Sequence, residues 1–344
     1  MRTAGGRRGD ATGLVVWGVV LAALVIGRAH PAAAAQGAAF VNGIVNVLTY
    51  NVCASGNKAG TCVADLTYAR RKTWARQVAD LIRGRKVDVA SFTEMCYAQV
   101  SLLKRALPGY RIVWYGYARG CGPGRSDGCR RLWGDLTDET TPPDGLTFGV
   151  ALALRDGTEG PPLRRRLRVD HAPRAGEVVH PRGLLCARGP VGPGRAVSCV
   201  THLSDTETPR QVLRLVTSYA GGDPVILTGD FNRMPKDPQL SPLYGMGVGD
   251  GPYAEADAAS CGVPVRGGEA TTRGGRKIDY IFGTEADYRP LRAAVIDTRP
   301  ELSDHRALTG TFAAVTTPRT PPSGDGPWRD IAQESRRRRP GRRR

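Results

Sequence analysis

Leu302-Ser303-Asp304-His305, near the end of the apolar part of the chain, is the stretch that decides the fold when it is taken with the polar motifs before it. Five shorter motifs precede it, and each comes at the end of an apolar run that predicts a buried strand. They are Tyr50-Asn51-Val52, Phe92-Thr93-Glu94, Thr201-His202-Leu203, Gly229-Asp230-Phe231-Asn232 and Ile278-Asp279-Tyr280. Carboxylates, amides and imidazoles at strand ends are the groups that a metal-assisted attack on a phosphate ester requires.

The spread of these motifs decides the number of domains. The chain has 344 residues, of which 41% are hydrophobic, so it can bury a sizeable core. Because the motifs run from Asn51 to His305, one site would draw on almost the whole span. We therefore expect a single catalytic domain over residues 36–317. Residues 318–344 are rich in Pro and Gly and then in Arg, which predicts a disordered basic tail.

The first 35 residues have the pattern of a signal peptide. Gly13 to Gly27 is an uncharged, mostly apolar run of 15 residues, preceded by three arginines and followed by Ala33-Ala34-Ala35. This pattern predicts export to the extracellular space with cleavage near Ala35. A retained membrane anchor is the alternative, but the run is shorter than the ~20 residues that a spanning helix needs.

Eight cysteines, an even number, agree with an exported protein that forms disulfides. Cys186 and Cys199 lie on two strand-like runs joined by a Gly-Pro-rich turn, so they could pair across a hairpin. Cys121 and Cys129 flank a Gly-rich loop and could close it. The pairing among the other four is left open; they are Cys53, Cys62, Cys96 and Cys261. A zinc site is disfavoured, because no C-x-x-C pair is present.

The hydrophobic pattern predicts many strands with few helices between them. Strands are predicted over 41–50, 87–92, 110–117, 146–154, 183–187, 196–200, 224–228, 280–282 and 308–315, and helices over 68–83, 99–106 and 209–220. Residues 119–144 are polar and turn-rich, which predicts a long surface loop. The pattern fits an α/β fold in which two mixed β-sheets pack face to face with helices outside.

The chain resembles a known family. The ordered set of strand-end residues is similar to that of the endonuclease/exonuclease/phosphatase superfamily over about residues 41–315. The resemblance implies a four-layered α/β sandwich of the DNase I-like type. His202 stands where the abasic-site endonucleases have an asparagine motif. It resembles the corresponding residue of the pancreatic-type DNase, sphingomyelinase, inositol-phosphatase and cytolethal-distending-toxin branches. Some members carry a second acid two residues after the first asparagine, where this chain has Cys53. The number of metal ions, one or two, is therefore left open.

The resemblance also implies a role for each residue of the set. Glu94 would bind the metal, and Asp304 would support the metal site. Asn51 would offer a neutral oxygen to the metal and a hydrogen-bond donor to the substrate phosphate. The ion is expected to be Mg²⁺, with Mn²⁺ or Ca²⁺ as alternatives, because oxygen ligands favour hard cations. The remaining roles are catalytic: Asp230 orients or deprotonates water, Asn232 holds a phosphate oxygen, Asp279 orients His305, and His202 faces the phosphate from the other side. His171 and His180 lie outside these motifs and are expected to be non-catalytic.

The substrate is less well determined than the reaction. The net charge of +17 favours a nucleic acid, DNA or RNA, although an arginine-rich composition also follows from a GC-rich genome. Arg182 could contact a substrate phosphate, or it could be a surface arginine without a role in binding. Phospholipid is the alternative substrate, for which Trp114-Tyr115 and Trp133 could form an exposed aromatic hairpin. A catalytically inactive binding module is a third hypothesis. We expect a monomer with no obligate protein partner.

Overall fold

The computed structural model describes residues 40–54, 62, 67–119, 128–139, 141–170, 180–204, 206–258, 265–298 and 302–316. The predicted signal peptide and the predicted basic tail lie outside these residues, as do Cys121, Cys261 and His171. Within the described part of the chain, no helix combines the length and the apolar composition that crossing a membrane requires.

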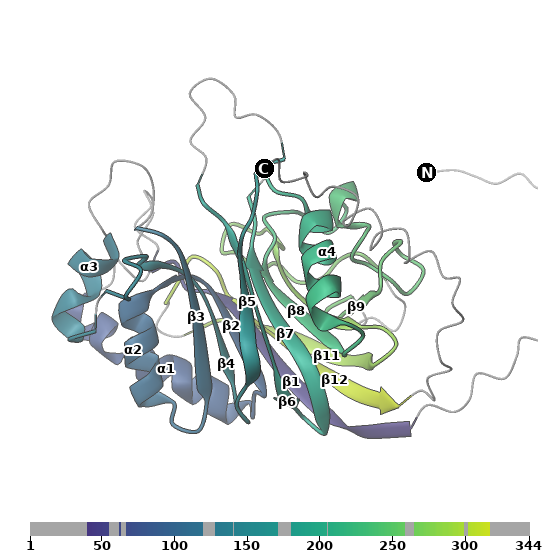
Figure 1. The fold of residues 1–344 in the computed structure, drawn as a ribbon, viewed down its shortest axis with the longest axis horizontal. Coiled ribbons are helices and arrows are strands. Elements are labelled where there is room, and N and C mark those ends of the chain that lie inside the picture. The colour runs from purple at the N-terminus through teal and green to yellow at the C-terminus, as the bar shows by residue number, and fades with distance from the viewer. Residues whose placement is uncertain are drawn as a thin grey trace, which may run out of the picture. The chain divides into compact units, whose positions relative to one another are not determined.

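The described strands form two six-stranded sheets (Figure 1). The first, sheet A, has the spatial order β11 (Tyr288–Ile296), β12 (Ala307–Thr316), β1 (Phe40–Asn51), β2 (Val89–Cys96), β4 (Phe148–Leu154) and β3 (Arg111–Ala118). The second, sheet B, has the order β5 (Glu159–Arg166), β6 (Gly183–Val191), β7 (Gly194–His202), β8 (Val225–Asp230), β10 (Asp279–Thr284) and β9 (Tyr253–Glu255). Both sheets are mixed, because β1–β2 and β7–β8 are parallel and the other neighbours are antiparallel.

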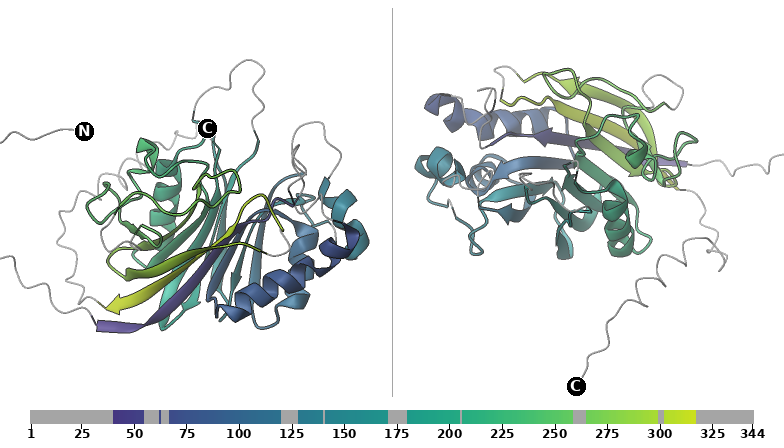
Figure 2. Two further views of the ribbon diagram at one scale, coloured as in Figure 1. Left: turned by 180° about the vertical axis from the view of Figure 1, so that it is seen from behind. Right: turned by 90° about the horizontal axis from the view of Figure 1, so that it is seen from above.

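The two sheets pack face to face, and helices cover their outer faces, as predicted (Figures 1 and 2). One apolar cluster joins side chains of sheet A, such as Leu152, to side chains of sheet B, such as Val200 and Ile281. It also includes α1 (Tyr68–Gly84) and α2 (Tyr97–Ala106). The alternate residues of sheet B pack with α4 (Pro209–Ala220) in a second cluster. These helices and sheets make the four layers of a DNase I-like sandwich.

The helices begin and end where their capping residues require. The predicted helix 209–220 is α4: the Thr208 side chain accepts a hydrogen bond from the amide of Gln211, and Pro209 takes the first helical position. Gly221 ends the helix with a φ of 61°, in the left-handed region that glycine adopts without a steric penalty.

The prediction that residues 119–144 form one long loop is wrong. This region contains α3 (Gly128–Trp133) and a 3₁₀ turn, η2 (Gly134–Leu136). Cys129 forms a disulfide with Cys96, so the predicted pairing with Cys121 is wrong. Trp133 is completely buried and packs edge-on against Trp74, so it cannot belong to an exposed aromatic hairpin. The segment is polar and Gly-rich, so it has no amphipathic pattern from which a docked helix could be predicted. The Cys96–Cys129 disulfide anchors it to the end of β2.

Three strands were not predicted: β5, β9 and β11 lie at sheet edges. β5 contains Pro161-Pro162 and three arginines, and β11 contains Pro290. Proline and charged residues hide the apolar alternation and are tolerated where one side of a strand has no partner. The short 3₁₀ turn η3 (Pro238–Leu240) completes the regular structure of the described residues.

Strand direction brings the predicted motifs to one end of the sandwich. Asn51 pairs with Thr93 across the parallel strands β1 and β2, and His202 pairs with Asp230 across β7 and β8. Asp279 opens the antiparallel β10 directly opposite Asp230. The motif that precedes β12 arrives at the same end, because β12 runs antiparallel to β1.

Candidate functional site

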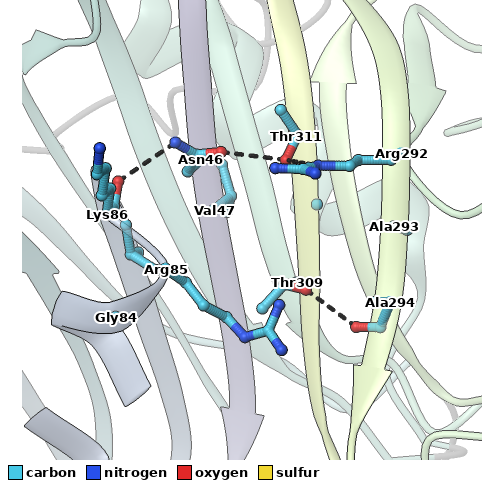
Figure 3. Close-up of a pocket in the computed structure, with 12 residues that line it drawn as sticks. Asn46, Val47, Gly84, Arg85, Lys86, Arg292, Ala293, Ala294, Thr309 and Thr311 are labelled. Atoms are coloured by element: carbon cyan, nitrogen blue, oxygen red, sulfur yellow. Dashed lines mark hydrogen bonds between the residues drawn. The ribbon is translucent and has the colours of Figure 1, made fainter. Parts of the chain in front are cut away.

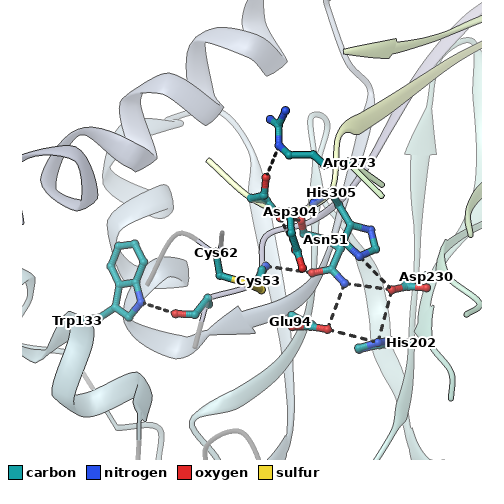
Figure 4. The surroundings of a disulfide bond; sticks show 12 residues. Asn51, Cys53, Cys62, Glu94, Trp133, His202, Asp230, Arg273, Asp304 and His305 are labelled. Atoms are coloured by element: carbon teal, nitrogen blue, oxygen red, sulfur yellow. Dashed lines mark hydrogen bonds and ion pairs between the residues drawn. A yellow bond between two sulfur atoms is a disulfide. The ribbon is translucent and has the colours of Figure 1, made fainter. Parts of the chain in front are cut away.

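Asn51 connects the two sheets at the site (Figure 4). Its side-chain nitrogen Nδ2 donates to Oε1 of Glu94 at 3.2 Å and to Oδ2 of Asp230 at 3.0 Å, while its oxygen Oδ1 accepts from the amide of Cys53 at 3.0 Å. The amide nitrogen, rather than the oxygen, therefore faces both carboxylates. The expectation that this oxygen would bind a metal stays a prediction; the described contact shows Asn51 orienting the two acids.

Glu94 reaches the site because β2 is irregular at this point. The pairing of β2 with β4 shifts register between Phe92 and Met95, and Glu94 has a φ of 51°, in the left-handed region that few non-glycine residues adopt. About a quarter of its side chain, 26%, is exposed to solvent. Such a conformation is kept where it aims a functional side chain. Asn232 has the same feature, with a φ of 51°.

His202 ends β7 and is completely buried. Its Nε2 atom lies 3.7 Å from Oε1 of Glu94 and 3.7 Å from Oδ2 of Asp230. Its Nδ1 atom lies 3.4 Å from the hydroxyl of Tyr117 and 3.4 Å from Nη1 of Arg182. Burial lowers the pKa of His202 well below its usual range, and the charge of Arg182 lowers it further. The imidazole is therefore neutral at neutral pH.

His305 and Asp279 form the opposite side of the site. His305 Nδ1 lies 2.8 Å from Asp279 Oδ2, and His305 Nε2 lies 3.9 Å from Oδ2 of Asp230. Burial alone would lower the pKa of His305, but the carboxylate of Asp279 and the more distant acids raise it to about 10. This imidazole is therefore protonated at neutral pH, in contrast to that of His202.

Asp230 lies between the two histidines. Burial and the neighbouring Asp279 raise the pKa of Asp230 to about 7, although His305, Asn232 and Asn51 act in the opposite direction. Oδ1 accepts from the amide of Asn232 at 2.8 Å, which holds the carboxylate in place. A carboxyl group with a pKa near neutrality is suited to exchange a proton with bound water.

The three predicted metal ligands all come from sheet A: Asn51 ends β1, Glu94 lies in β2 and Asp304 precedes β12. Ser303 lies between Asp304 and Asn51. Its Oγ donates to the carbonyl of Asn51 at 2.8 Å and lies 3.3 Å from Oδ1 of Asp304. The carboxylates of Asp230 and Asp279 and a ring nitrogen of His305 lie within 4.8 Å of one another. Oδ1 of Asp279 is buried and has no hydrogen-bond partner among the described residues. A divalent cation here would bind carboxylate oxygens and not the protonated His305.

Sequence reasoning missed several residues of the site. Tyr117 belongs to an ordinary strand pattern, so nothing in the sequence marks its contact with His202. Ser303 stands inside the quoted motif but has a role that only the folded chain reveals, since its Oγ also accepts from the amide of His305. His180 was expected to be non-catalytic, and this stays a prediction; burial lowers its pKa, and the charge of Arg182 lowers it further.

A separate cavity of about 440 Å³ lies on sheet A beside the end of α1 (Figure 3). Arg85, Arg292, Asn46 and Thr311 are among the residues that line it. Asn46 lies five residues before Asn51 on β1, and none of the strand-end motif residues lines the cavity. It is therefore distinct from the candidate site.

Comparisons with known proteins agree with this geometry. The model of the Endonuclease/Exonuclease/phosphatase family matches residues 48–305. No curated protein matches the sequence significantly. Among solved structures, the human Nocturnin catalytic domain with bound sulfate is 17% identical, with a TM-score of 0.54 and coverage of 81% of this chain and 96% of that chain.

Two bacterial structures are similar to the same degree. An endonuclease/exonuclease/phosphatase family protein from Bacteroides thetaiotaomicron is 16% identical, with a TM-score of 0.53 and coverage of 79% of this chain and 97% of that chain. A mannosyl-6-phosphatase from the same species is 17% identical, with a TM-score of 0.52 and coverage of 79% and 99%. At these identities the likeness establishes the fold and leaves the substrate open.

Proposed function

Because the chain belongs to the endonuclease/exonuclease/phosphatase family, whose members hydrolyse phosphoester bonds, we propose that it is a secreted, divalent-metal-dependent phosphodiesterase that cleaves nucleic acid. One observation carries the proposal. Oδ2 of Asp230 lies 3.7 Å from Nε2 of His202 and 3.9 Å from Nε2 of His305, so two imidazoles of opposite protonation state flank one carboxylate.

The reaction follows from these positions. Asp230 accepts a proton from water as the water oxygen attacks phosphorus, and the P–O bond to the leaving group breaks. Asn232 and the neutral His202 donate hydrogen bonds to the non-bridging oxygens. His305, kept protonated by Asp279, stabilises the negative charge that develops and donates a proton to the leaving oxygen. Each group then acts in the protonation state that its surroundings favour.

A bound Mg²⁺ or Mn²⁺ would supply positive charge to the phosphate in the transition state. The residues that would hold it are Glu94 and Asp304, with Asn51, the third candidate ligand, orienting Glu94. Ca²⁺ is the weaker alternative. One ion is expected, because Cys53, in a disulfide, stands where a second acid would be needed.

A nucleic-acid substrate agrees with the net charge of +17, since neutralised phosphates release counterions on binding. Nη1 of Arg182 lies 3.4 Å from Nδ1 of His202, which supports a contact between Arg182 and a phosphate that enters the site. Secretion agrees with the disulfides, which indicate an oxidising compartment. Trp133, one of the three aromatic residues on which the phospholipid hypothesis relied, is buried.

One panel of substrates tests the proposal. Purified protein with Mg²⁺ is incubated in parallel with plasmid DNA, RNA, sphingomyelin, phosphoinositides and a phosphomonoester dye. Cleavage of nucleic acid by the wild-type chain, but not by His305→Ala, is the expected result. Cleavage of the monoester or of a lipid alone would replace the proposed substrate class, and cleavage of none would favour a binding module.

A further inference from the structure

Two candidate metal ligands each stand two residues before a disulfide-bonded cysteine. Asn51 precedes Cys53, which is bonded to Cys62, and Glu94 precedes Cys96, which is bonded to Cys129. The third candidate, Asp304, has a carboxylate oxygen within 4.8 Å of the sulfur atoms of Cys53 and Cys62 (Figure 4). All three candidate ligands are thus adjacent to a disulfide, in sequence or in space.

The first disulfide fixes the chain that leaves β1. Cys53 has a φ of 41°, and its amide donates to Oδ1 of Asn51 at 3.0 Å. The amides on either side, those of Val52 and Ala54, donate to the carbonyls of Thr93 and Glu94, both at 3.0 Å. This segment therefore aligns Asn51 with Glu94, and the bond to Cys62 holds Cys53 in a conformation that non-glycine residues rarely adopt.

The second disulfide supports the first. It ties the end of β2 to α3, and α3 ends at Trp133, whose Nε1 donates to the carbonyl of Ala54 at 3.1 Å. Trp133 is fully buried and packs against Trp74 of α1. The carbonyl of Ala54 therefore has a buried partner that is present only if α3 is docked.

The third disulfide provides a contrast. Cys186 and Cys199 face each other across the antiparallel strands β6 and β7, which stay paired from Gly183–His202 to Val191–Gly194. The backbone ladder maintains this register without the covalent bond. Cys53, by comparison, follows the end of β1, where the strand ladder has finished.

We propose that Cys53–Cys62, supported by Cys96–Cys129, is a positioning element for the cation ligands, so that this chain binds its divalent cation tightly only when oxidised. The inference rests on the proposed function. Reduction by a dithiol consumes two electrons and two protons, breaks the S–S bond and leaves two thiols, while the dithiol becomes a cyclic disulfide. Cys53 is then free to leave its left-handed conformation, and the amide that orients Asn51 is lost from the site.

Mn²⁺ binding, measured by titration calorimetry, tests the inference on the full-length chain. Cys53→Ala/Cys62→Ala is compared with the matched control Cys186→Ala/Cys199→Ala. We expect at least a tenfold loss of Mn²⁺ affinity in the first variant and less than a twofold loss in the control. An equal loss of Mn²⁺ affinity in both variants, or no loss in either, would overturn the inference.

A second variant keeps the test valid if the first fails to fold. Trp133→Phe retains both disulfides and the aromatic packing but removes the N–H donor to Ala54. A threefold to tenfold loss of Mn²⁺ affinity supports the inference, and an unchanged affinity contradicts the role of α3. Oxidised wild-type protein that binds Mn²⁺ but cleaves no phosphodiester would refute the proposed function alone, whereas an active Cys53→Ala/Cys62→Ala variant with wild-type affinity would refute the inference alone.

Discussion

The imidazole Nδ1 of His305 lies 2.8 Å from Oδ2 of Asp279, and both side chains are buried at the junction of the two sheets. The carboxylate fixes the orientation of the ring, so the other nitrogen, Nε2, faces Asp230 at 3.9 Å. Asp279 also raises the pKa of His305 against the effect of burial, to about 10. His305 therefore carries a positive charge, in the resting site, beside the carboxylate that is proposed to activate water.

Asp279→Asn should lower turnover by ~10²–10⁴-fold, the range of a positioned acid–base group. The double variant with His305→Ala should lose little more than either single variant, because the two residues act as one unit. Steady-state kinetics on plasmid DNA measure this, with the exposed Asp250→Asn as the control. Additive losses would show that Asp279 acts independently of His305.

The same substitution should lower the pKa of His305, because it removes the largest favourable charge. In the wild-type protein the protonated imidazole contributes stability that is present below pH 6.5 and is lost as pH rises toward 10. An NMR titration of the ring nitrogens of the chelator-treated protein checks the direction of the change. A pKa that does not fall in Asp279→Asn would contradict the assignment.

His202 should make the metal-free protein less stable in acid. Its pKa is lowered in the folded state, so below pH 6.5 the unfolded chain binds a proton that the folded chain does not. Stability therefore falls as pH decreases, by up to ~1.4 kcal/mol per pH unit for this group. Urea unfolding in EDTA at pH 7 and pH 5.5 should show a smaller fall for His202→Gln than for the wild type; equal falls would mean that His202 titrates normally.

Lys277 should be essential for stability although it performs no chemistry. Its ammonium group lies 2.9 Å from Oε1 of Glu255 and 3.0 Å from Oδ2 of Asp257, and it is 2% exposed. Removing one member of a buried charge network costs ~3–5 kcal/mol. Lys277→Met is therefore expected to lower the urea midpoint strongly, whereas the exposed Lys72→Met should leave it nearly unchanged. A stable Lys277→Met protein would show that the two acids accept protons instead.

The predicted basic tail, outside the described residues, offers a test of the substrate class. Residues 329–344 carry eight arginines and two acids. Deleting them should weaken DNA binding most at low salt and flatten the dependence of log affinity on log salt, by about 0.9 for each lost phosphate contact. Turnover at saturating substrate should hardly change, because no proposed catalytic residue lies in the tail. An unchanged salt slope would separate the tail from the substrate.

Much of the fold could be predicted from the sequence, because the central strands are apolar runs and several of them carry a polar motif at or near one end. The bounds of α4 were predicted correctly, since Thr208, Pro209 and Gly221 are local capping signals. The edge strands β5 and β11 were missed because edge positions tolerate proline and arginine. Local sequence carries no comparable signal for them.

The candidate site was predictable only in part. The sequence predicted a shared site at strand ends. In the structure, direct contacts connect four of its residues: Asn51, Glu94, His202 and Asp230. Tyr117 could not be predicted, because its contact with His202 depends on how the two sheets stack. The Cys96–Cys129 disulfide was also missed, since it depends on where a polar segment docks rather than on spacing along the chain.

We propose that a cation held by Glu94 activates this site for phosphodiester hydrolysis. The most direct test is plasmid cleavage by the wild type and by Glu94→Gln in EDTA, with Mg²⁺ added back in steps, together with Mn²⁺ titration of both proteins. The exposed Glu269→Gln serves as the control. We predict no cleavage in EDTA, full recovery for the wild type and control, and at least a hundredfold loss of both Mn²⁺ affinity and cleavage for Glu94→Gln. Full cleavage in excess chelator, or a Glu94→Gln protein as active as the wild type, would contradict the account.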